Sequence, residues 1–158
     1  MKTTLPMAIK LVIDTNVMVS SLSRHSAYHW LVAGILVGKF DLYVTTEILL
    51  EYEEILKNKY SDSVANNFLI ALKELPNVHF VQVYYRWQLL KDADDNKFID
   101  CYVAANAGYL LTHDAGFKTL KSLSFPVIRV ISLDEFKALP AFWLILQNKY
   151  IPANKYIA

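Results

Sequence analysis

The chain alternates between short apolar runs and longer segments in which apolar residues recur every three or four positions. The apolar run 9–13 is typical of a buried strand in a parallel sheet. Residues 46–58 place Ile48, Tyr52 and Ile55 at helical spacing, after Thr45 or Thr46 as the capping residue. Ser61 and Ser132 are the predicted capping residues of two later helices. The full pattern predicts strands at 9–13, 42–44, 78–83, 109–112 and 127–131, helices at 15–22, 26–37, 46–58, 61–75, 92–107, 116–122 and 133–139, and a tail without regular structure over 141–158.

Strands that alternate with helices indicate βαβ units and a sheet covered by helices. We therefore expect a three-layer α/β/α sandwich with a central, mostly parallel, twisted sheet. A length of 158 residues suits one domain, which we place at 1–140. The remaining segment, 141–158, is expected to pack on that domain or at an interface through its aromatic residues Phe142, Trp143, Tyr150 and Tyr156.

Composition narrows the class of protein. Apolar residues make up 54% of the chain and mean hydropathy is +0.25, so part of the apolar surplus is expected to cover a partner interface. The sequence has neither a run long enough for a membrane span nor a recognisable signal peptide. The single cysteine, Cys101, excludes an internal disulfide framework, and we predict a cytoplasmic protein. A net charge of +1 neither indicates nor excludes nucleic-acid binding.

Two apolar runs end at an aspartate, and this is the most informative feature of the sequence. Asp14 follows the run 9–13, and Asp114 follows the run 109–112. Right-handed crossovers place the carboxyl ends of parallel strands at one edge of the sheet, where ligands bind in open α/β folds. Asp94 and Asp95, at the start of the helix that leads to the second strand, belong to the same edge. Because like charges repel at short distance, a divalent metal ion is the commonest reason for such a gathering.

Each acid also has a simpler interpretation. Asp14 could be only a helix cap, and Asp114 only a turn residue. Asp94, Asp95 and Asp100 compete for the third position, of which we choose Asp95. On the helix 46–58, Glu51 lies among apolar residues and is the glutamate expected to point inward.

Four segments in order carry a family resemblance, which covers about residues 9–136. They are Val12-Ile13-Asp14-Thr15-Asn16-Val17, the stretch from Thr46 to Leu56, Asp94-Asp95-Asn96-Lys97-Phe98-Ile99-Asp100, and Leu111-Thr112-His113-Asp114. The chain resembles the PIN-domain ribonucleases, in particular the branch of toxins from toxin–antitoxin systems. The resemblance implies an acidic site formed by Asp14, Glu51, Asp95 and Asp114, with Asp100 as a further candidate ligand and Asn16 and Thr112 as neighbouring polar residues.

Hard oxygen ligands favour Mg²⁺ or Mn²⁺, as one ion or two. The expected activity is hydrolysis of RNA phosphodiester bonds by water, and the expected partners are RNA, a second copy of the chain and a small antitoxin protein. Unpaired regions of RNA are the expected target. Candidate contacts to the RNA backbone are Arg24, Lys57, Lys118 and Lys121.

Other chemistries fit less well. His25 and His29 have a zinc-compatible spacing but no accompanying metalloprotease glutamate. Asn16 stands where a haloacid-dehalogenase-type phosphotransferase would have its second aspartate. Cys101 suits a buried apolar role better than that of a nucleophile. Two alternatives stay open: a PIN protein that matures RNA without a toxin role, and a catalytically silent binding or regulatory module.

Overall fold

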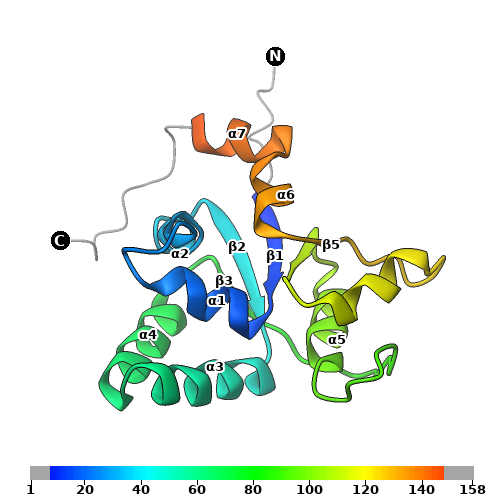
Figure 1. Ribbon diagram of the computed structural model, residues 1–158, viewed down its shortest axis with the longest axis horizontal. Coiled ribbons are helices and arrows are strands. Elements are labelled where there is room, and N and C mark those ends of the chain that lie inside the picture. Colours follow the sequence, from blue (N-terminus) through cyan, green and yellow to red (C-terminus); the bar gives the residue numbers. More distant parts are fainter. Residues whose placement is uncertain (1–7, 148–158) are drawn as a thin grey trace.

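Five parallel strands form the centre of the computed structural model, which describes residues 8–147 (Figure 1). The strand order is β3-β2-β1-β4-β5, and every neighbouring pair is parallel. Ile13, the last residue of β1, is in register with Leu111, the last residue of β4. The strands are β1 (Ile9–Ile13), β2 (Phe40–Val44), β3 (Val78–Phe80), β4 (Tyr109–Leu111) and β5 (Val130–Ile131).

Helices flank this sheet and complete the predicted α/β/α sandwich, so the expected fold class is confirmed. α2 packs on β2, and α5 packs on β1, β2 and β4, while α1 contacts α2 and α3. The helical elements are α1 (Thr15–Leu22), α2 (His29–Leu36), α3 (Thr46–Lys59), α4 (Asp62–Glu74), α5 (Asn96–Ala105), the 3₁₀ segment η1 (Ala115–Ser122), α6 (Leu133–Lys137) and α7 (Pro140–Gln147).

Hydroxyl side chains fix where three helices begin. Thr45, Ser61 and Ser132 each accept a hydrogen bond from the backbone N–H three residues later, as N-cap residues do. The predicted capping roles of these three residues are therefore confirmed. At the end of α5, Asn106 adopts a left-handed conformation (φ 49°), which asparagine tolerates better than most residues.

The helix expected to open at residue 92 begins at Asn96 instead. The Asn96 side chain bonds both the N–H and the C=O of Leu90 and also the C=O of Asp92. The Asp92 carboxylate accepts the N–H of Asp94, so residues 92–95 form a closed turn before the helix. Residues 81–95, which connect β3 to α5, are called the strap below. Further along the strap, the N–H of Trp87 donates to Asp100 Oδ1 at 2.9 Å.

Three further boundaries differ from the prediction by three residues each. α2 starts at His29 rather than residue 26, because the hydroxyls of Ser23 and Ser26 accept backbone N–H groups in the preceding turn. β3 ends at Phe80 rather than residue 83, and β5 includes only 130–131. His25 consequently lies in a turn and not on a helix with His29, which removes the basis for a paired zinc site.

Aromatic rings from α2, β2, α6 and α7 pack together in the core. Phe142 of α7 packs against Trp30, Phe40 and Phe136, with ring centroids 5.1, 6.0 and 5.6 Å away. The segment expected to trail off thus contains a helix, α7, that buries Phe142 in the same core as the sheet. Tyr150 and Tyr156 lie outside the described residues. Within residues 8–147, no helix has the length and apolar character needed to cross a membrane.

Candidate active site

Asp14 lies at the carboxyl end of β1, in the centre of the sheet. Its side chain is buried, with 6% of the residue exposed, and its Oδ2 accepts a hydrogen bond of 2.7 Å from the Thr112 hydroxyl. Its backbone N–H donates to the C=O of Leu111 at 3.0 Å, which extends the ladder between β1 and β4 by one residue. Asp14 is therefore held from two directions at the junction of these strands.

Thr112 connects the two strand-end aspartates. While its hydroxyl donates to Asp14, the same oxygen accepts the backbone N–H of Asp114 at 3.0 Å. Asp114 in turn caps η1, because its Oδ1 accepts the N–H of Gly116 at 2.7 Å. One side chain thus fixes the relative positions of Asp14 and Asp114, which are 100 residues apart in the chain.

Asp95 faces the same region from the turn that precedes α5. Burial raises the pKa of its carboxyl to about 6, and the charges of Asp92, Asp14, Asp114 and Glu51 contribute to the rise. Burial also raises the pKa of Asp14, with smaller contributions from Glu51 and Asp114, while the hydrogen bond from Thr112 acts in the opposite direction. The structure therefore brings Asp14, Glu51, Asp95 and Asp114 into one interacting group.

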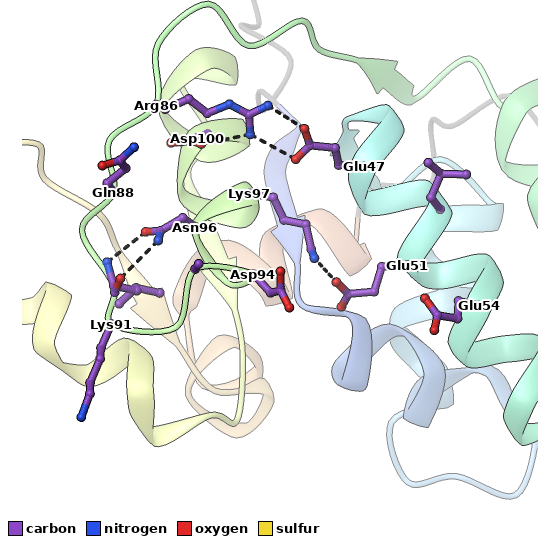
Figure 2. Close-up of a pocket in the computed structure, with 13 residues that line it drawn as sticks. Glu47, Glu51, Glu54, Arg86, Gln88, Lys91, Asp94, Asn96, Lys97 and Asp100 are labelled. Atoms are coloured by element: carbon purple, nitrogen blue, oxygen red, sulfur yellow. Dashed lines mark hydrogen bonds and ion pairs between the residues drawn. The ribbon is translucent and has the colours of Figure 1, made fainter.

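Two clefts flank this group. The larger one, of about 750 Å³, lies between α3 on one side and the strap and α5 on the other (Figure 2). Glu51 and the exposed Asp94 line it. A smaller cleft of about 440 Å³ is lined by Asp92, Asp95 and Asp114. A substrate could approach the acids from either side.

Asp100 contacts the strap. It is almost fully buried; its Oδ1 accepts the Trp87 N–H, and its Oδ2 lies 3.6 Å from Arg86 of the strap. It thereby fastens the strap to α5. Of the three aspartates that compete for the third position, Asp95 has a pKa that burial raises and to which the charges of Asp14 and Asp114 contribute.

The other predicted residues are more scattered. Asn16 is exposed, and its backbone N–H contributes to lowering the pKa of Asp14. Lys57 lies near the C-terminal end of α3 and forms an ion pair of 2.6 Å with Glu53. Exposed positions are also occupied by Arg24, in the turn after α1, and by Lys118 and Lys121 on η1. Cys101 is fully buried, and burial raises the pKa of its thiol to about 12, as expected of a packing residue.

Two cations in the larger cleft were missed at the sequence level. Lys97 of α5 forms an ion pair with Glu51, and Arg86 of the strap forms a bidentate pair with Glu47 at 2.6 and 3.1 Å. Both pairs join α3 to segments that lie 39 or more positions further along the chain. The only available signal was the position of Lys97, two residues after Asp95 at the start of a helix.

Comparison with known proteins identifies the family. A family model described as PIN domain matches residues 10–116, which include all four acids. The chain belongs to the PIN-domain family. PIN domains are generally nucleases, and they generally use divalent metal ions.

The solved structure of VapBC2 supports the same fold. VapBC2 from Rickettsia felis, crystallised with a DNA fragment from its promoter, matches with a TM-score of 0.54 and 14% identity. The match covers 77% of this chain and 97% of the other. The PIN domain of T. brucei RRP44 matches with a TM-score of 0.45 and 14% identity over 84% of this chain and 81% of the other. No curated protein matches the sequence significantly.

The donor atoms of this PIN-domain site fit a hard divalent cation, because Asp14, Glu51, Asp95 and Asp114 offer only carboxylate oxygens. Burial raises the pKa values of Asp14 and Asp95 and repulsion among the carboxylates adds to the rise; a divalent ion would relieve that repulsion. Over residues 8–147, however, no three histidine, cysteine or acidic side chains are already arranged to hold a metal ion. In this structure the carboxylates are therefore not arranged around a single metal position.

Proposed function

We propose that this PIN domain is a metal-dependent endoribonuclease whose site is formed by Asp14, Glu51, Asp95 and Asp114. The observation that supports it best is the pair of hydrogen bonds through which Thr112 connects Asp14 and Asp114. The charges of Asp14, Asp114 and Glu51 also contribute to the raised pKa of Asp95. A structural explanation for Asp14 as a simple helix cap fails, because its side chain forms no capping hydrogen bond in α1.

The four carboxylates would hold Mg²⁺ or Mn²⁺, which when bound supplies charge for the scissile phosphate and lowers the pKa of an attacking water. The hydrogen bond from Thr112 keeps the Asp14 side chain in one orientation. Burial of Asp14 excludes bulk water from its side chain and strengthens its electrostatic interactions. Hydrolysis by water leaves a 5′-phosphate and a 3′-hydroxyl.

The proposed substrate is single-stranded or looped RNA, whose backbone can enter an open cleft. The exposed cations Arg24, Lys118 and Lys121 are proposed contacts to its phosphates. Lys57 is a weaker candidate, because it already pairs with Glu53.

We further propose that the enzyme is the toxin of a toxin–antitoxin pair, acts in the cytoplasm and forms a homodimer. Support comes from its resemblance to toxin PIN domains and from the shared fold with VapBC2, a complex of that type. Exposed apolar residues that such partners could cover include Leu50 on α3 and Ile70 on α4. The homodimer is tested by the mass of the purified protein in solution, measured by light scattering.

The nuclease is tested with purified protein and structured RNA in Mg²⁺ or Mn²⁺. We expect cleavage that stops in EDTA and in Asp14→Asn, whereas Asp134→Asn, an exposed aspartate on α6, cleaves like the wild type. Cleavage that survives Asp14→Asn would indicate a contaminating nuclease. Intact RNA with every metal would contradict the proposal.

The toxin role is tested by induced expression in bacteria. We expect growth arrest with the wild-type chain and normal growth with Asp14→Asn at the same expression level. Normal growth with an active wild-type enzyme would instead favour a role in RNA maturation.

A further inference from the structure

Lys97 lies at the boundary between the acidic group and the larger cleft. It is the second residue of α5, and only 14% of its side chain is exposed. Its ammonium reaches across to α3 and forms an ion pair with Glu51 Oε2 (Figure 2). The same Nζ lies 5.7 Å from the ring centroid of Phe98. The charge is therefore held in a defined place rather than in open solvent.

The partner of this ammonium is one of the four proposed metal ligands. While Lys97 pairs with Glu51, the carboxylate is neutralised by a single charge on a flexible stem. The charge of the same carboxylate contributes to the raised pKa values of Asp14 and Asp95. No three acids are yet arranged to hold a metal ion in the described residues 8–147, as expected if Glu51 is engaged elsewhere.

We propose that Lys97 is a built-in counter-ion of the acidic site, which competes with a divalent cation for Glu51. This inference rests on the proposed function. In the metal-free protein, Lys97 stabilises Glu51 beside the other acids; when the site takes up a divalent ion, Glu51 exchanges the ammonium for the metal. The released ammonium stays in the cleft, where a substrate phosphate is its natural partner.

If the pair between Lys97 and Glu51 had a purely structural role, removing it would change metal affinity in the opposite direction. If the pair only tied α3 to α5, its loss would leave Glu51 less well placed and would weaken metal binding. A second connection between α3 and α5 exists in any case, because Arg86 forms two hydrogen bonds with Glu47 of α3 and also contacts Asp100 of α5. The sign of the change in metal affinity therefore separates the two roles.

The test measures Mn²⁺ binding to the purified full chain without RNA, by the electron paramagnetic resonance signal of free Mn²⁺. For Lys97→Met we expect about tenfold tighter binding, the size of effect expected for removing one nearby cation. Lys91→Met is the matched control, because Lys91 lines the same cleft but is exposed and outside α5. It should change the affinity much less. Lys97→Arg, which keeps the charge, should bind Mn²⁺ about as the wild type does.

A second pair of proteins tests whether Lys97 acts through Glu51. In the Glu51→Gln background, adding Lys97→Met should bring little further gain, since the contested carboxylate is gone. Lys97→Gln replaces the methionine variant if circular dichroism shows that the latter is unfolded. Equal or weaker Mn²⁺ binding by folded Lys97→Met, or an equal gain in the Glu51→Gln background, would overturn the inference.

The readout is separate from the nuclease proposal. If the wild type and its variants bind Mn²⁺ in the expected order of affinity but the wild type leaves RNA intact, the nuclease proposal is contradicted and the counter-ion proposal is supported. Absence of Mn²⁺ binding in the wild type and in Lys97→Met alike would overturn both.

Discussion

At the scale of single residues, Thr112 shows how much the proposed site depends on one hydroxyl. It donates to Asp14 and accepts from the N–H of Asp114, so Thr112→Val removes both contacts with little change in shape. We expect RNA cleavage to fall by about tenfold or more, the loss typical of residues that orient a metal ligand. Thr112→Ser keeps the hydroxyl and should retain most of the activity. Wild-type cleavage rates in Thr112→Val would show that the bridge is not needed.

Asp95 and Asp100 lie five residues apart, and we expect their substitutions to have different effects on metal binding. Asp95→Asn should weaken Mn²⁺ binding, because it removes a charge from the acidic group. Asp100→Asn keeps an oxygen that can accept the Trp87 N–H, so it should leave Mn²⁺ affinity nearly unchanged. Titration of both variants under the same conditions checks this. A larger loss of affinity in Asp100→Asn would make Asp100, and not Asp95, the third ligand.

At the scale of elements, the sequence predicted best what short-range chemistry decides. The run 9–13 with its following aspartate and the hydroxyl caps Thr45, Ser61 and Ser132 depend on neighbouring residues alone, and the structure confirms them. The predicted start of α5 was wrong because the Asn96 side chain forms hydrogen bonds with the backbone of Leu90 in the strap, which hydrophobic periodicity cannot indicate. The pair between Lys97 and Glu51 joins two helices distant in sequence, so no spacing rule could indicate it.

The contact between α2 and β2 gives a prediction at the same scale. Gly34 lies in α2, and a Cβ atom there would overlap with the ring of Phe40, which is fully buried in β2. Alanine is ordinarily the better helix former, by about 1 kcal/mol. Here we expect Gly34→Ala to lower the free energy of unfolding by about 1–2 kcal/mol, because overpacking of a close-packed core outweighs that gain.

Urea denaturation of the two proteins measures this change. Ala33→Gly, at the preceding and less buried position of the same helix, is the control that isolates helix propensity. An increase in stability for Gly34→Ala would mean that Phe40 can move aside without loss.

At the scale of the whole molecule, α7 belongs to the folded domain. Phe142 is 2% exposed and packs with Trp30, Phe40 and Phe136, which come from α2, β2 and α6. In addition, Lys39 Nζ donates to the C=O of Leu146 at 3.1 Å, so α7 is also fastened beside the start of β2. Residues 140–147 therefore complete the core of the sheet, far from the acids in sequence.

This arrangement predicts a large difference between two neighbouring aromatic residues. Phe142→Ala should destabilise the protein by about 3–5 kcal/mol, as for other buried phenylalanines, whereas Trp143→Ala, with Trp143 51% exposed, should change stability little. Thermal unfolding followed by circular dichroism measures both. Because Phe142 lies against β2 rather than the acidic group, Phe142→Ala should still bind Mn²⁺ at temperatures where it is folded. Similar melting temperatures for Phe142→Ala and the wild type would show that the domain is complete without α7.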